Sequence, residues 1–168
     1  MNAEVHVSCK KILLVEDDPR DVELTLAALA EHQLANEVMV LRDGAEALDY
    51  FFRRGNFLGR AGGEPLAVLL DLKMPRVTGI EVLRAVKADA MLKTIPIIML
   101  TSSREEPDLV QCYQLGVNAY VVKPVDFLDF MDAIKGLGLF WAAINEPPAG
   151  SLPRPKVFAG GTSKPKAP

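Results

Sequence analysis

Val68-Leu69-Leu70-Asp71-Leu72-Lys73-Met74-Pro75 is the stretch that decides the fold of this chain. Its three apolar residues are typical of a strand buried on both faces, and a carboxylate follows where that strand must end. Proline then turns the chain out of the sheet, because it has no N–H to donate and restricts the residue before it. Asp71 is therefore predicted at the carboxyl end of a central strand, where open α/β sheets bind ligands.

Four further apolar segments are predicted as buried strands, with helical patterns between them. They are expected at Lys11–Val15, Val38–Leu41, Pro96–Thr101 and Ala119–Val122. With the strand that ends at Asp71, this makes five strands. Strand and helix then alternate five times, which is the pattern of a parallel sheet with helices on both faces.

Capping signals predict where the helices begin. Asp18 before Pro19 reads as an N-cap with proline in the first turn, and Asp126 as the cap of the last helix. Gly79 is expected to begin the third helix. The segments Asp43-Gly44-Ala45-Glu46 and Ser103-Arg104-Glu105-Glu106 resemble capping boxes of the second and fourth helices.

Helix ends are marked by basic residues and glycine. Arg53-Arg54-Gly55 predicts the end of the second helix, with Gly55 as its C-cap, and Gly116 predicts the end of the fourth. The last helix is expected to run toward Trp141, and Gly136 and Gly138 weaken it enough to allow a kink or a break.

The overall composition fits one well-packed domain. The chain has 168 residues, of which 49% are hydrophobic, and a mean hydropathy of +0.15. No apolar run approaches the ~20 residues needed to span a bilayer, and Met1 to Cys9 lacks a signal-peptide core, so a cytoplasmic protein without membrane contact is expected. Cys9 and Cys112 are isolated, which excludes a CxxC redox or zinc motif.

Charge is unevenly distributed along the chain. The net charge is −3, but residues 147–168 carry four basic groups and no acid, so residues 1–146 carry −7. A domain this acidic is a poor candidate for nucleic-acid binding. The segment 147–168 also holds six of the twelve prolines and is expected to be a disordered tail.

Polar residues follow the predicted strands where these end. Glu16 and Asp17 follow the first strand, Asp71 the third, Thr101 closes the fourth, and Lys123 follows the fifth. Each taken alone has an ordinary explanation, such as a turn aspartate, a strand-end hydroxyl or a surface lysine. Together they are expected at one edge of the sheet, where crowded acids repel unless a cation lies between them. Oxygen ligands without His or Cys favour Mg²⁺.

A metal, a lysine and a hydroxyl around one carboxylate form a phosphoryl-transfer site. The metal and Lys123 would neutralise charge on the phosphoryl oxygens, and the Thr101 hydroxyl would donate to one of them. Asp71 would be the nucleophile and form an acyl phosphate.

Four segments resemble the receiver domain of bacterial response regulators in two-component systems. They are Ile12–Asp18, Val68–Pro75 with Gly79, Met99–Ser102 and Tyr120–Pro124. The resemblance implies a receiver domain over residues 10–146 with a flavodoxin-like, doubly wound five-stranded sheet of order 2-1-3-4-5. The tail is too short and too polar to be an output domain, so a single-domain regulator is expected.

The resemblance also assigns the metal ligands. It implies that Asp71 is the phosphoacceptor, that Asp17 binds Mg²⁺ directly and that Glu16 holds it through water. Lys73 falls where the family uses a backbone carbonyl as a ligand, and Mn²⁺ is an expected substitute.

A second group of roles concerns the phosphate and the conformational switch. Thr101 and Lys123 match the phosphate-contacting pair, and Tyr120 matches the switch aromatic, which would turn inward as Thr101 moves to the phosphoryl group. The bond from Lys123 to Pro124 is expected to be cis. Lys73 and Ser103 flank the approach of water to the acyl phosphate, and Lys73 is expected to set the hydrolysis rate.

The expected partner is a sensor histidine kinase. The residue sequences of Asp17–Leu24 and Asp43–Tyr50, with the long Asn56–Glu64 stretch, most resemble those of regulators partnered with phytochrome-type kinases. Apolar residues near the end of the last helix either pack on the protein's own sheet or form a homodimer, through the face of the fourth helix, fifth strand and last helix or through a C-terminal arm. These residues are Leu137, Leu139, Phe140, Trp141 and Ile144.

Two other functions are compatible with this fold. A phosphatase with the same aspartyl chemistry would want a second acid where Lys73 stands, so no enzyme acting on other substrates is expected. A flavin or nucleotide carrier would need a Gly-rich loop after the first strand, where Glu16-Asp17-Asp18-Pro19 would instead repel phosphate.

Overall fold

Five parallel strands form one sheet in the computed structural model, which describes residues 12–146. The order is β2-β1-β3-β4-β5, so the predicted 2-1-3-4-5 topology is confirmed. The strands are β1 (Ile12–Val15), β2 (Val38–Leu41), β3 (Ala67–Leu70), β4 (Ile97–Thr101) and β5 (Ala119–Val122). The predicted tail 147–168, Cys9 and the expected domain start at residue 10 lie outside the described residues.

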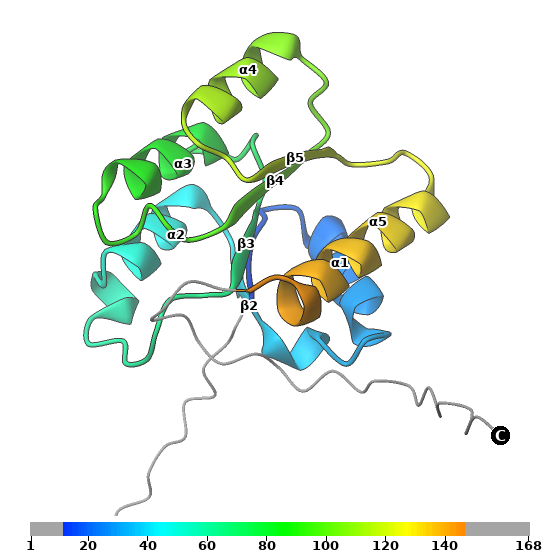
Figure 1. Cartoon of the computed structure of the whole chain (residues 1–168), viewed down its shortest axis with the longest axis horizontal. Helices are drawn as coiled ribbons and strands as arrows, with labels where there is room; N and C mark the ends of the chain where they lie inside the picture. The colour runs from blue at the N-terminus through cyan, green and yellow to red at the C-terminus, as the bar shows by residue number, and fades with distance from the viewer. Residues whose placement is uncertain (1–11, 147–168) are drawn as a thin grey trace, which may run out of the picture.

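Helices cover both faces of this sheet (Figure 1), as its doubly wound pattern requires. One face carries α1 and α5, and the other carries α2, α3 and α4. Their bounds are α1 (Pro19–Ala30), α2 (Gly44–Phe51), α3 (Gly79–Ala88), α4 (Glu106–Gln114) and α5 (Phe127–Leu139). Short helical turns occupy η1 (Ala35–Glu37), η2 (Gly55–Phe57) and the π-helix η3 (Phe140–Ile144).

Two apolar layers result from the alternation of side chains along the strands. In β1, Leu13 and Val15 face α2, α3 and α4, while Ile12 and Leu14 face α1 and α5. All four residues of β1 and of β3 are buried, which explains why their sequences are apolar without alternation. Within residues 12–146, no helix is long and apolar enough to cross a membrane.

The predicted helix starts are largely confirmed. The Asp18 side chain accepts a hydrogen bond of 2.8 Å from the Arg20 N–H and caps α1. Asp43 caps α2 by accepting from the Glu46 N–H at 2.8 Å, but the Glu46 carboxylate accepts from the N–H of Arg42, one residue before the cap. The sequence therefore predicted the cap of α2 correctly and only half of its capping box.

The predicted capping box at Ser103 is wrong. The α4 helix begins at Glu106, and its N-cap residue, Glu105, makes no side-chain cap bond. The Ser103 hydroxyl instead donates to Asp108 at 2.8 Å, and its N–H donates to the Thr101 hydroxyl at 3.1 Å. These bonds hold the chain between β4 and α4 as an ordered loop rather than a first helical turn.

The predicted end of α4 is confirmed, whereas the predicted ends of α2 and α5 need revision. Gly116 follows α4 with φ +92°, as expected of a glycine C-cap. After α2, however, Arg53 adopts the left-handed conformation (φ 54°), and Gly55 begins η2. The α5 helix runs without a break to Leu139, and Gly138 is needed for packing, because a Cβ there would overlap the Leu29 side chain of α1.

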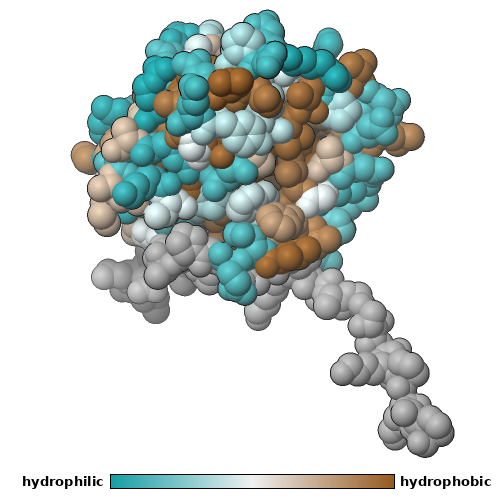
Figure 2. Space-filling view, turned by 45° about the horizontal axis from the view of Figure 1, so that its top comes forward, coloured by the Kyte–Doolittle hydropathy of each residue, from teal (hydrophilic) through white to brown (hydrophobic). Residues whose placement is uncertain are grey.

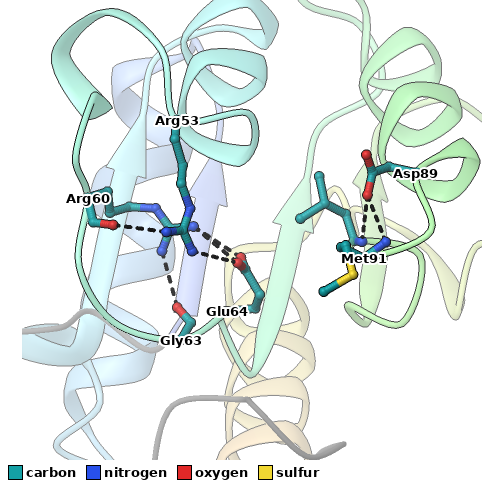
Figure 3. A network of polar contacts seen from close by, with 7 residues as sticks. Arg53, Arg60, Gly63, Glu64, Asp89 and Met91 are labelled. Carbon is teal, nitrogen blue, oxygen red and sulfur yellow. Dashed lines mark hydrogen bonds and ion pairs between the residues drawn. The ribbon is translucent and has the colours of Figure 1, made fainter.

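The loop before β3 is held by a cluster of charged side chains (Figure 3). Arg53 and Arg60 both point toward Glu64, at 3.5 and 3.1 Å, and Arg60 also donates to the Gly63 carbonyl. The Arg60 guanidinium lies 4.1 Å from the centre of the Tyr50 ring on α2. The long stretch predicted as a surface loop is therefore anchored to α2.

Candidate functional site

The ends of β1 and β3 lie side by side and bring their polar residues together. The register pairs Val15 with Leu70, so Glu16 and Asp71 follow at the same edge. The Asp71 N–H donates to the Val15 carbonyl at 3.0 Å, which extends the strand pairing by one residue. Both carboxyl side chains are buried, with side-chain exposures of 3% for Glu16 and 9% for Asp71.

Three carboxylates form a cluster at this edge. One oxygen from each of Glu16, Asp17 and Asp71 lies within 4.8 Å of the other two. Oxygens on opposite sides of an octahedral Mg²⁺ are about 4.2 Å apart, so the cluster fits a divalent metal after a small contraction, with water completing the shell. The all-oxygen donor set also suits a hard cation.

Lys123 reaches into the cluster from the end of β5. Its amino group lies 2.6 Å from Glu16, 2.6 Å from Asp21 and 3.6 Å from Asp71. Four carboxyl groups, counting Asp17, thus face one ammonium group, which leaves an excess of negative charge that a divalent cation would offset.

Burial and charge shift the pKa values of these groups. Burial raises the pKa of Glu16 to about 7, although its hydrogen bond to Lys123 opposes the shift. Burial also raises the pKa of Asp71, again against the charge of Lys123. For Lys123 itself burial acts to lower the pKa, but its bonds to Asp21 and Glu16 outweigh burial and raise it. Lys123 is therefore positively charged at neutral pH.

Thr101 and Tyr120 meet at the loop between β4 and α4. The Thr101 side chain is fully buried and accepts from the Ser103 N–H, so its own hydroxyl proton stays available for another acceptor. The Tyr120 hydroxyl donates to the Ser103 carbonyl at 3.2 Å. The two residues predicted as a switch thus contact the same residue of one loop.

Lys73 uses its side chain outside the carboxylate cluster. Its amino group forms an ion pair of 3.2 Å with Glu105, and both side chains are more than half exposed. The role of its backbone carbonyl as a metal ligand stays a prediction.

The predicted cis bond between Lys123 and Pro124 is wrong for this structure. No cis peptide bond occurs in residues 12–146, so this bond is trans. The trans form is the lower-energy isomer of a bond to proline by about 0.5–1 kcal/mol, and Lys123 reaches the carboxylates with it.

Some contacts at the site could not be predicted from the sequence. Asp21 lies in the first turn of α1, and its carboxylate accepts a hydrogen bond from Lys123, 102 positions away in the sequence. Gly79 lies against the Asp71 carbonyl, and Gly44 against that of Val77, so closely that a Cβ at either would overlap the oxygen. The close approach of α2 and α3 to the loop after β3 could not be inferred without the fold.

Comparison with known proteins gives a consistent result. The family model described as "Response regulator receiver domain" matches residues 12–135. The response regulator Rcp1 of Synechocystis is 36% identical over 132 residues, which cover 79% of this chain and 88% of Rcp1. The structure of the Mn²⁺-bound form of Rcp1 superposes with a TM-score of 0.77 at 35% identity, covering 82% of this chain and 98% of that one.

Two further solved structures are similar over most of their length. The crystal structure of the phosphorylated cyanobacterial phytochrome response regulator RcpA has a TM-score of 0.77 and 37% identity, covering 83% of this chain and 99% of that one. The bacteriophytochrome response regulator AtBRR is 63% identical, with a TM-score of 0.63, covering 80% of this chain and 96% of its own.

Proposed function

The chain belongs to the response regulator receiver domain family, and we propose that it is a phosphorylation-activated signalling switch. In this proposal Asp71 accepts a phosphoryl group from a sensor histidine kinase in a Mg²⁺-dependent reaction. The observation that carries it is the buried Asp71 carboxylate, with the Lys123 ammonium 3.6 Å away and two further acids in the same cluster.

The reaction is a phosphoryl transfer between two side chains. An Asp71 oxygen attacks phosphorus, the P–N bond of the kinase phosphohistidine breaks, and its electron pair leaves with the imidazole nitrogen, which takes up a proton. Lys123 neutralises charge on the phosphoryl oxygens, and the Thr101 hydroxyl donates its free proton to one of them. The product is an aspartyl phosphate.

Glu16, Asp17 and Asp71 would hold the metal, with the Lys73 carbonyl as a further ligand. When bound, a divalent cation supplies the positive charge that lets phosphate approach this acidic pocket. Mg²⁺ suits the oxygen donors and Mn²⁺ is a substitute; Rcp1, a similar protein, has a Mn²⁺-bound form.

Phosphorylation would alter the loop that Thr101 and Tyr120 share. If the Thr101 hydroxyl turns to the phosphoryl group, it withdraws from the Ser103 N–H, and the loop that Tyr120 contacts must adjust. The result would be a changed surface over α4, β5 and α5, the readout of the switch.

The proposed partner is a phytochrome-type histidine kinase in the cytoplasm, because similar chains include phytochrome response regulators. A homodimer is proposed as well. Its support is the apolar surface of η3 next to α5, where Phe140 is 45% and Ile144 62% exposed. Figure 2 shows hydrophobic residues gathered in an interrupted band across one face of the molecule. Light scattering should give twice the monomer mass, falling to the monomer mass in Ile144→Asp.

The protein is proposed to catalyse only its own phosphoryl transfer and dephosphorylation. Lys73 occupies the position two residues after Asp71, and its side chain pairs with Glu105 rather than offering a second acid. Turnover of an external phosphate ester would overturn this part of the proposal.

Labelling by acetyl phosphate tests the proposed function. Purified protein should take up a phosphoryl group with Mg²⁺ and lose this ability in EDTA and in Asp71→Asn. Asp49→Asn is a matched control, because Asp49 is an exposed carboxylate of α2 that pairs with Arg54. Labelling that survives Asp71→Asn would reject the proposal.

A further inference from the structure

An ion pair joins the two loops that carry the phosphoacceptor and the buried hydroxyl. Lys73 lies two residues after Asp71, and Glu105 lies four residues after Thr101, yet their side chains meet at 3.2 Å. The strands β3 and β4 that precede these loops are neighbours in the sheet. Because Lys73 and Glu105 are 55% and 66% exposed while Asp71 is buried, the pair lies on the solvent side of these loops.

The position of Glu105 makes this pairing notable. Glu105 is the N-cap residue of α4, but its side chain makes no cap bond to the helix. Its N–H is 3.4 Å from the Ser103 hydroxyl, in the loop that Tyr120 also contacts. The carboxylate is thus used between loops rather than within its helix, and it ties the start of α4 to the Asp71 loop.

We propose that Lys73 is a second cation for the phosphoryl group on Asp71, and that Glu105 binds the Lys73 amino group until Asp71 is phosphorylated. The inference rests on the proposed function and concerns the regulation of the same site. In the unmodified protein Lys73 pairs with Glu105, and in the phosphorylated protein it pairs with the phosphoryl oxygens.

The charges favour this exchange. An exposed ion pair shifts an equilibrium by only about two- to fivefold, so the Lys73–Glu105 pair opens readily. An aspartyl phosphoryl group replaces one carboxylate charge by a group with roughly the charge of a phosphate ester, about −1.5 to −2, two residues from Lys73. The Lys123 ammonium is shared among Glu16, Asp21 and Asp71, so a second cation would add neutralisation of the phosphoryl charge that Lys123 alone does not provide.

The exchange has a structural consequence at α4. When Lys73 leaves Glu105, the loop before α4 loses its side-chain link to the loop after β3. Coupling between two equilibria is reciprocal. The free energy by which the ion pair with Glu105 disfavours the phosphorylated state therefore equals the free energy by which phosphorylation disfavours the ion pair.

Binding of beryllofluoride, a phosphoryl mimic, tests the exchange at equilibrium in the full chain with Mg²⁺. Glu105→Gln should tighten binding about threefold, because Lys73 is then free, and Lys73→Gln should weaken it by a similar factor. In the Lys73→Gln background, Glu105→Gln should have no further effect. Glu106→Gln, the neighbouring acid in the first turn of α4, should leave affinity unchanged.

A second measurement needs neither metal nor phosphate. In the unphosphorylated protein in EDTA, amide hydrogen exchange of residues 102–106 should be about threefold faster in Lys73→Gln, in Glu105→Gln and in the double variant alike. The inference would be overturned if Glu105→Gln changed the affinity for beryllofluoride equally with and without Lys73. It would also be overturned if the variants left the amide exchange rates of residues 102–106 unchanged. If labelling still requires Asp71 in that case, the proposed function stands and only the role of Lys73 fails.

Discussion

Lys123 and Glu16 form an ion pair of 2.6 Å across 107 positions of the sequence, with side-chain exposures of only 10% and 3%. Parallel topology brings the ends of β5 and β1 to one edge of the sheet, and Lys123 then spans the intervening strands to reach Glu16. The pair leaves the acids crowded but partly neutralised in the absence of metal.

Lys123→Met should therefore destabilise the metal-free protein. Removing the ammonium leaves Glu16, Asp21 and Asp71 without their shared cation, and breaking such a buried pair costs about 3 kcal/mol. Urea unfolding at neutral pH in EDTA measures the loss, and Mg²⁺ should restore part of it. Lys135→Met is the control, because Lys135 pairs with Glu31 and Asp132 on the surface and its loss should change little.

Stability should depend on pH with opposite signs with and without Mg²⁺. Glu16 has an ordinary pKa of 4.5, raised by burial to about 7 in the folded protein. Between these values the folded state holds a proton that the unfolded state has lost, so without metal the free energy of unfolding falls as pH rises, by about 3 kcal/mol. Mg²⁺ binds the ionised form, so with saturating Mg²⁺ stability should rise over the same range.

Urea unfolding at about pH 5 and about pH 8, in EDTA and in Mg²⁺, checks this prediction. Glu16→Gln should flatten the dependence in EDTA, because the variant has no proton to lose in that range. A metal-free stability that increases toward pH 8 would contradict the role of Glu16.

Gly79→Ala should disturb the phosphoacceptor loop. A Cβ at Gly79 would overlap the Asp71 carbonyl oxygen, so the loop must shift, at a cost of about 2 kcal/mol, and labelling by acetyl phosphate should slow. Gly136→Ala on α5 is the matched control, since open space surrounds that position and the change should stabilise the helix by about 0.5–1 kcal/mol. Equal stability and labelling in both variants would refute the close-approach argument.

Asp43→Ala should remove the cap of α2. Its side chain accepts from the Glu46 N–H, and this bond, with the nearby Arg76, holds the pKa of Asp43 below its ordinary value. The cap should contribute about 1 kcal/mol at neutral pH and progressively less as acid protonates the folded carboxylate below pH 3.8. Asp43→Asn keeps a capping oxygen, so it should retain most of the stability in thermal unfolding; a loss equal to that of Asp43→Ala would contradict the cap.

The arrangement of the site could be predicted because parallel strands end at a common edge. Once the apolar runs were read as strands, Glu16, Asp71 and Lys123 were expected at one edge of the sheet. The structure places the Lys123 amino group 2.6 Å from Glu16 and 3.6 Å from Asp71. The metal ligands and the switch role of Tyr120 are predictions from the resemblance to receiver domains.

Other features depend on neighbours that a linear pattern does not reveal. Ser103 has a good capping sequence, but its hydroxyl bonds Asp108 and its N–H bonds Thr101, so the helix begins later. In the linear sequence Asp21 and Glu105 look like ordinary surface acids, and only the fold places Lys123 beside Asp21 and Lys73 beside Glu105. The isomer of the bond to Pro124 was predicted wrongly because the two forms differ by only about 0.5–1 kcal/mol, so tertiary context decides between them.

Locating the phosphoryl group after incubation with acetyl phosphate and Mg²⁺ tests the central claim most directly. Intact mass followed by peptide mapping should find one phosphoryl group per chain, on the peptide that contains Asp71, and none in Asp71→Asn or in EDTA. A phosphoryl group on any other residue, or unchanged uptake by Asp71→Asn, would contradict the account.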